Sequence, residues 1–227
     1  MTSPESSARR RVDAYFSASF EVARRLSEGR GSEAVLVLRR ELDRTRDVED
    51  VAGRRFLLSQ IALCQSRMGD VSEAQSTLEE IEDTLPPDIE TALMLAEGYL
   101  LLVANAERAS HHAARALQWL EEEGEVPPDT LSRAHSLMAR ALLHTNDVLG
   151  AFGAWKLSPL PDWRVGVELI EAGYDPQHVL EILRAALPQH RAFEATTGSE
   201  GKASSDRIER LIQWIEAGCP KNSQLPV

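Results

Sequence analysis

Residues 57–86, which read LLSQIALCQSRMGDVSEAQSTLEEIEDTLP, decide the fold of this chain. Apolar residues before the glycine recur three and four positions apart, the spacing of one buried stripe on an α-helix. Gly69 can adopt a positive φ and end that helix, and Asp70 and Ser72 offer oxygen atoms that can cap the next one. Pro86 cannot continue the second helix. The stretch therefore predicts two amphipathic helices joined by a tight turn.

The same turn pattern recurs along the chain, with a turn residue ahead of a small alanine. The copies are Gly29 with Ala34, Gly69 with Ala74, Asn146 with Ala151, and a weaker, shorter one from Asn105 to Ala109. The small alanine lets the second helix of each pair cross closely over the first. Because one amphipathic pair cannot bury its own apolar stripe, a recurrence of this kind predicts stacked helix pairs.

Turn residues and Pro-Pro pairs divide most of the chain into segments of helical length. These are residues 12–28, 32–46, 51–68, 72–84, 88–104, 106–123, 129–145 and 147–157. Ala and Leu dominate the apolar residues, and no window alternates with the period of a strand. This composition predicts an all-α protein.

At this point the sequence resembles the tetratricopeptide repeat family, whose unit is a helix-turn-helix with small residues at the crossing. The residues that carry the resemblance are Leu58, Ile61, Ala62, Gln65, Gly69, Asp70, Ala74, Leu78, Ile81 and Pro86. The chain departs from the family pattern at Leu58, Ala62 and Gln65, where the family favours tryptophan, glycine and an aromatic residue. The resemblance covers residues 12–157 and implies a TPR-like α-solenoid of about four to five helical hairpins.

The remaining segments are assigned from composition and turn signals. We expect a disordered N-terminal arm over residues 1–11 and an additional helical hairpin over 158–190, with helices at 163–172 and 177–187. Residues 191–205 are rich in Gly, Ser and Thr and predict a flexible linker. Residues 206–217 predict an amphipathic helix that caps the solenoid, followed by a tail over 218–227.

The sequence predicts no catalytic residue, no cofactor and no metal site. His111 and His112 are adjacent, so they point about 100° apart on a helix rather than at one ion. Cys64 stands in an apolar stripe and is interpreted as a small buried residue. Residues 198–202 look like a phosphate loop, but Thr196 stands where its first glycine is required and Ala203 where its hydroxyl is required.

Charge is distributed unevenly along the chain. The formal net charge is −11 and the pI is about 5.1, which argues against a nucleic-acid partner. Residues 70–125 contain 14 acidic and two basic residues and hold most of this charge. Two interpretations stay open: a solvated outer helical face, or a surface that attracts a basic partner segment.

The sequence predicts neither a membrane span nor a targeting signal. The most apolar stretch, residues 92–104, is too short to cross a bilayer and has Glu97 and Gly98 in its middle. Acidic residues Asp13 and Glu21 stand where a secretory signal needs its apolar run, and they also count against a mitochondrial presequence. We therefore expect no membrane partner and a cytoplasmic location.

Stacked hairpins line a concave groove with their first helices, and such grooves bind peptides or helices. Taking the resemblance turn by turn, the groove residues are Phe56, Ser59, Leu63, Arg67, Glu90, Leu93, Glu97, Arg133, Ser136, Arg140 and His144. The predicted function is a non-catalytic adaptor or scaffold for a protein or peptide partner. One alternative is a dedicated chaperone or assembly subunit, such as that of a bacterial secretion system. The other is an enzyme of unrecognised type, which would need a closed polar pocket.

Overall fold

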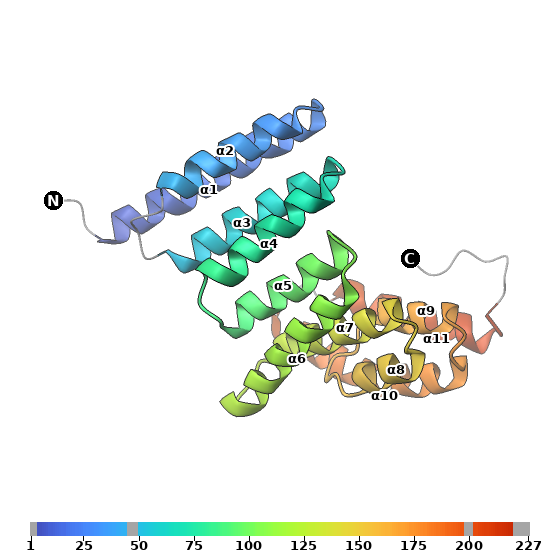
Figure 1. Ribbon diagram of the computed structural model, residues 1–227. Helices are drawn as coiled ribbons and strands as arrows, with labels where there is room; N and C mark the ends of the chain where they lie inside the picture. The colour runs from blue at the N-terminus through green and yellow to red at the C-terminus, as the bar shows by residue number, and fades with distance from the viewer. Residues whose placement is uncertain (1–3, 45–49, 198–201, 220–227) are drawn as a thin grey trace. The chain divides into compact units, whose positions relative to one another are not determined.

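The computed structural model describes residues 4–44, 50–197 and 202–219. Within these ranges the chain forms eleven α-helices and no β-strand (Figure 1), so the prediction of an all-α protein is confirmed. The helices are α1 (Pro4–Ser27), α2 (Gly31–Arg44), α3 (Val51–Arg67), α4 (Val71–Thr84), α5 (Ile89–Leu101), α6 (Ala106–Glu123), α7 (Pro128–His144), α8 (Val148–Lys156), α9 (Trp163–Glu171), α10 (Pro176–Thr197) and α11 (Lys202–Glu216).

Three helices extend beyond the predicted bounds: α1, α10 and α11, the last of which begins at Lys202 inside the expected linker 191–205. Helix α1 begins at Pro4, inside the expected disordered arm, because proline is well suited to the first turn of a helix and no breaker follows it. Helix α10 continues through Pro188 to Thr197, into the expected linker 191–205. The buried Glu194 carboxylate explains this extension, since it accepts hydrogen bonds from the Ser205 amide (2.9 Å) and hydroxyl (2.6 Å). Of the linker, only residues 198–201 lie outside the described residues; of the tail, residues 220–227 do.

The chain divides into two compact units, one ending at Arg108 and the other beginning at Ala109. The division falls inside α6, whereas the sequence places the end of the repeat domain at residue 157. Unit 1 contains α1 to α5, and unit 2 contains α7 to α11 together with most of α6.

Unit 1 is a sequential array of helices. Each helix from α1 to α5 packs against the next one, and α3 packs against both α1 and α5 (Figure 1). The core of unit 1 contains fully buried side chains from α2, α3, α4 and α5. They include Leu38, Leu57, Ile61, Leu78 and Leu93.

The turns predicted from the repeat pattern have the expected backbone. Gly29, Gly69 and Asn146 adopt φ angles of 72°, 84° and 61°. At each turn this residue donates to the carbonyl three positions back, and the next residue donates to the carbonyl five positions back. This pair of bonds is the Schellman motif, and it satisfies carbonyls that the helix end would leave unpaired. The alanines that follow these turns, Ala34, Ala74 and Ala151, have no exposed surface.

The weaker fourth copy of the turn is built differently. There the positive φ of 53° falls on Ala104, and the Asn105 side chain instead caps α6 by accepting from the Arg108 amide at 3.1 Å. Ala109 is nevertheless buried, as the pattern predicts.

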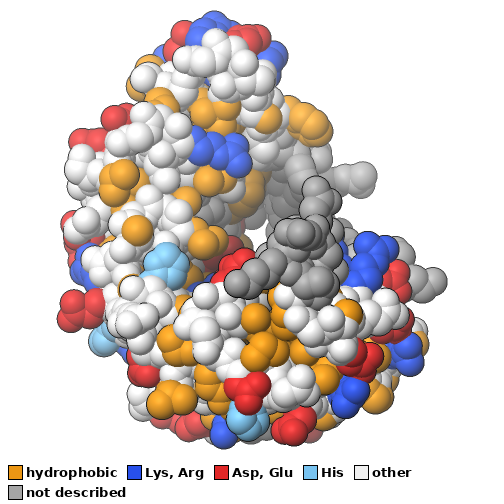
Figure 2. Space-filling model, turned by 90° about the vertical axis from the view of Figure 1, so that its right-hand side faces the viewer, with side chains coloured by type: hydrophobic (Ala, Val, Ile, Leu, Met, Phe, Trp, Pro, Cys, Tyr) orange, Lys and Arg blue, Asp and Glu red, His pale blue; other side chains and the backbone are white. Residues whose placement is uncertain are grey.

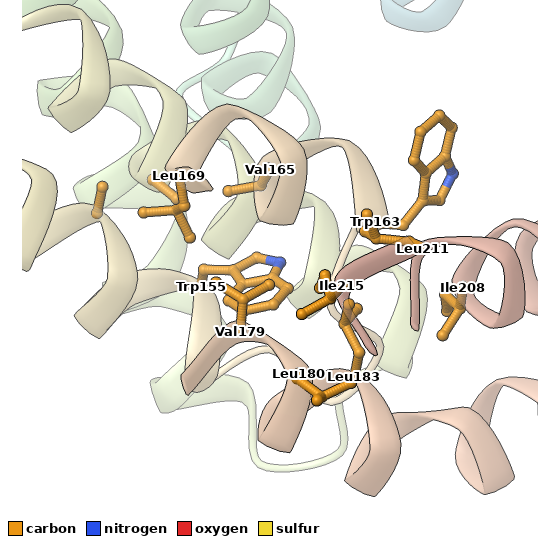
Figure 3. Packing of buried hydrophobic residues seen from close by; sticks show 12 residues of the cluster. Trp155, Trp163, Val165, Leu169, Val179, Leu180, Leu183, Ile208, Leu211 and Ile215 are labelled. Atoms are coloured by element: carbon orange, nitrogen blue, oxygen red, sulfur yellow. The ribbon is translucent and has the colours of Figure 1, made fainter. Parts of the chain in front are cut away.

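Unit 2 is built around α9, which packs against α7, α8, α10 and α11. Trp155 lies in the middle of the buried cluster (Figure 3), fully enclosed, and its indole nitrogen donates to the Asp162 carbonyl at 2.9 Å. Gly166 of α9 leaves room for this ring, because a Cβ there would lie 3.2 Å from it. Helix α11 contributes Ile208, Leu211 and Ile215 to the cluster. The last helix is therefore part of the core of unit 2.

Candidate interaction surface

Helices α1 and α3 are joined at the N-terminal end of α3. The Tyr15 hydroxyl donates to Asp50 at 2.7 Å, and the other carboxylate oxygen of Asp50 caps α3 by accepting from the Gly53 amide at 2.9 Å. The Tyr15 ring occupies the space that a Cβ at residue 53 would need. Glycine at this position therefore allows the close approach of the two helices.

Helices α3 and α5 are likewise joined through a capping aspartate that binds a side chain of the neighbouring helix. Asp88 caps α5 through the Thr91 amide at 2.7 Å, and Arg55 of α3 donates to both Asp88 oxygens at 2.6 and 2.8 Å. Burial alone would raise the pKa of Asp88, but the bonds from Thr91 and the charge of Arg55 outweigh it and lower that pKa. At the other end of α3 the Ser66 hydroxyl donates to the Leu102 carbonyl at 3.0 Å. The three helices α1, α3 and α5 are thus held in register by side-chain hydrogen bonds.

The four predicted groove residues of α3 all reach the surface. Phe56 is 38 % exposed and lies against Tyr15, with 6.5 Å between the ring centroids. Ser59 and Leu63 are half-buried, and Arg67 is exposed. Their spacing of three and four residues places them on one face of α3, over about 16 Å of helix.

On α5 one predicted groove residue is wrongly placed. Leu93 has no exposed surface and belongs to the core, because α5 is apolar around most of its circumference. Glu90 is exposed and Glu97 is half-buried.

The predicted groove residues of α7 lie in unit 2 and are described separately. Arg133 and His144 are exposed, and Ser136 is half-buried. The Arg140 side chain is only 20 % exposed and holds Glu168 of α9 through two nitrogens, at 2.9 and 3.1 Å. Arg140 therefore joins α7 to α9 within unit 2.

A hollow of about 680 Å³ lies at the C-terminal end of α3, where Arg67 forms part of its lining. Its lining comes from the end of α1, the turn after it, the first residue of α2 and the end of α3: Ala23, Leu26, Ser27, Gly29, Gly31, Arg67 and Met68. The Met68 side chain lies directly against Gly31, where a Cβ would collide with its sulfur atom. Of these lining residues, only Arg67 was predicted from the sequence as part of a groove. The sequence offers one further signal, which is Gly31. This glycine begins α2, and the turn before α2 needs a glycine only at residue 29.

Charged side chains beside the hollow are paired with one another. Arg24 pairs with Glu21 (2.7 Å) and Glu28 (2.9 Å), and Arg25 pairs with Glu21 (2.6 Å) and Glu33 (2.5 Å). Arg30 pairs with Glu28 and Glu33. Among the described residues no ion pair involves Arg67, so its charge is the one left uncompensated in the lining of the hollow.

The acidic segment of unit 1 is partly neutralised from within. Arg108 pairs with Glu79 at 2.9 Å and Glu82 at 3.2 Å, and Arg39 pairs with Glu80 at 2.6 Å. Arg108 also donates to the buried Tyr99 hydroxyl at 2.7 Å, and burial raises the pKa of that phenol. Glu79, Glu80 and Glu82, three of the four carboxylates within residues 79–83, therefore already have cationic partners.

Exposed apolar side chains lie among charged ones over the surface. On the face shown in Figure 2, hydrophobic groups (orange) lie in separate patches, with basic and acidic groups scattered among them. In unit 1 the most exposed large apolar side chain among the described residues is Phe20 of α1, at 78 %.

The described residues contain no group of three or more His, Cys, Asp or Glu side chains that could hold a metal ion. In the same part of the chain, no helix combines the length and the apolar character that a membrane span requires. The chain matches no family model, no curated protein and no solved structure.

Proposed function

We propose that the protein is a non-catalytic interaction module, an adaptor or scaffold that binds a partner helix along α3. The observation that carries this proposal is the exposed stripe of Phe56, Ser59, Leu63 and Arg67, which is bordered by α1 and ends in the hollow. We call these four residues the α3 stripe.

The dimensions of the α3 stripe suit an amphipathic helix. Anchors at three- and four-residue spacing over about 16 Å match roughly three turns of a partner, the usual form of helix-in-groove recognition. Phe56 supplies a partly exposed aromatic ring, and aromatic side chains dominate the binding energy of many interfaces.

The hydrogen bonds that hold α1, α3 and α5 in register also favour binding. Tyr15 of α1 binds Asp50, which caps α3. Arg55 of α3 likewise binds Asp88, which caps α5. A surface that is already ordered loses less conformational entropy when a partner binds.

The repeated turns support a TPR-like arrangement within unit 1 as part of this proposal. The turns at Gly29 and Gly69 have the same hydrogen bonds, and each is followed by a buried alanine at the helix crossing. The packing of α3 against both α1 and α5 is the contact that first helices of successive hairpins make in such arrays.

The test is quantitative affinity capture from the source cells, followed by titration of the purified partner. We expect Phe56→Ala and Leu63→Ala to weaken binding about tenfold or more each, as anchor residues do. The matched control is Leu36→Ala, which removes an exposed leucine from α2, a helix that contributes none of the four stripe residues. Equal loss in the control, or no loss in the stripe variants with their helical content intact, would refute the proposal.

A further inference from the structure

The geometry points to a specific kind of partner: an amphipathic helix that places an apolar side chain in the hollow and a carboxylate on Arg67. This inference rests on the proposed function and names the chemistry of its ligand.

The lining of the hollow is mainly apolar. Ala23, Leu26 and Met68 line it together with two glycines that carry no side chain, Gly29 and Gly31. The hollow is open to the surface, and its volume of about 680 Å³ leaves room for a large apolar side chain.

The charged side chains around the hollow determine which polar group of the partner can bind beside that apolar side chain. Arg24, Arg25 and Arg30 are each held by glutamates, whereas Arg67 has no ion pair among the described residues. Asp70, three positions after Arg67, is exposed but does not line the hollow. A guanidinium beside an apolar surface binds a carboxylate through two parallel hydrogen bonds and repels a cation.

This local charge is opposite to the expectation from the whole chain. The net charge of −11 favours a basic partner, but within unit 1 three of the four carboxylates at residues 79–83 are paired internally with Arg39 or Arg108. At the hollow the uncompensated group is positive, and the part of the partner that lies there is acidic.

The positions of the anchors also set the register of the partner. Phe56 and Arg67 are about 16 Å apart along α3. In a helix lying along the stripe, the residue that contacts Phe56 and the acidic residue are therefore separated by about three turns.

The experiment selects ligands from a displayed library of helical peptides with the full chain as bait. Peptides are selected on the wild type, on Arg67→Glu, and on Arg40→Glu, which reverses an exposed arginine of α2 that is likewise outside every ion pair of the described residues. Selected peptides are then synthesised and titrated by fluorescence anisotropy against these proteins, against Arg67→Gln and against Phe56→Ala.

We expect wild-type ligands to carry Asp or Glu at one end of an apolar stripe, and Arg67→Glu to select Lys or Arg at the same position. Replacing that acidic residue by its amide should weaken binding to the wild type about fivefold, with no effect on binding to Arg67→Gln. Arg40→Glu should select the same peptides as the wild type.

Two results would overturn the inference in distinguishable ways. If the selected peptides need Phe56 for binding but show no preference for an acidic residue, or if that preference does not change with Arg67→Glu, the inference of an acidic partner is wrong. The proposed binding along α3 would then still stand. If the affinity of the selected peptides does not depend on Phe56, the α3 stripe is not the binding surface, and the proposed function is wrong as well.

Discussion

Glycines at two positions of this chain show how differently one residue type can act. Gly69 has a φ of 84° and forms a Schellman turn, whereas Gly153 lies inside helix α8. At both positions a Cβ would meet no atom within 4 Å, so steric collision plays no part in either substitution. The difference between them is purely conformational.

We expect Gly69→Ala to lower the free energy of unfolding by about 1 kcal/mol, because alanine disfavours the left-handed backbone. Gly153→Ala should raise it by about 0.5–1 kcal/mol, because alanine is the better helix former. Urea titrations followed by circular dichroism give both values. Changes of the same sign in the two variants would contradict this account.

The second prediction at the scale of single residues concerns His190, which is buried with its Nε2 3.2 Å from the Pro161 carbonyl. Burial lowers the pKa of this imidazole below its usual value of about 6.5. As the pH falls below about 6.5, this histidine becomes protonated in the unfolded chain but stays neutral in the folded chain. The free energy of unfolding therefore falls as the pH falls.

His190→Gln should therefore flatten the dependence of stability on pH between about 7 and 5. The slope should not vanish, since burial also lowers the pKa of His135. The exposed His144 offers the matched control, because His144→Gln changes a side chain that is solvated in both states. The measurement is urea unfolding at several pH values, and an unchanged slope in His190→Gln would exclude this histidine as the source.

At the scale of elements, α1 and α3 depend on a close approach at Gly53. We expect Gly53→Ala to cost about 1–3 kcal/mol, because the Tyr15 ring must move and its bond to Asp50 is lost. Tyr15→Phe should cost only about 1 kcal/mol, the value of one hydrogen bond. Because both changes break the same bond, Tyr15→Phe should cost little more once Gly53→Ala is present. Fully additive losses in urea unfolding would show that the two residues act independently.

At the scale of the whole molecule, the division into two units predicts separable stability. Trp155→Ala empties the centre of the unit 2 cluster and should cost about 3–5 kcal/mol there. Hydrogen exchange read by mass spectrometry should show faster exchange in peptides from α7 to α11, with peptides from α3 and α4 unchanged. Faster exchange of both sets together would mean that the chain unfolds as one cooperative body.

Local signals predicted the helices and turns well. Gly29, Gly69 and Asn146 were recognisable because few residue types tolerate a positive φ, and the alanines after them because only a small side chain fits a close helix crossing. Leu93 and Arg140 were assigned to a groove from their register alone. Which face of a helix a neighbour covers is set by packing, and this placed Leu93 in the core and Arg140 on Glu168.

The sequence by itself determined the all-α class, most helix boundaries to within two residues and the backbone of three turns, because these follow from interactions within a few residues. Only the tertiary structure decided the division inside α6, the extension of α10 by the Glu194 contact, and the hollow that combines Arg67 with side chains some forty positions earlier. Burial and charge compensation depend on which groups meet across helices. That information is absent from any short window of the chain.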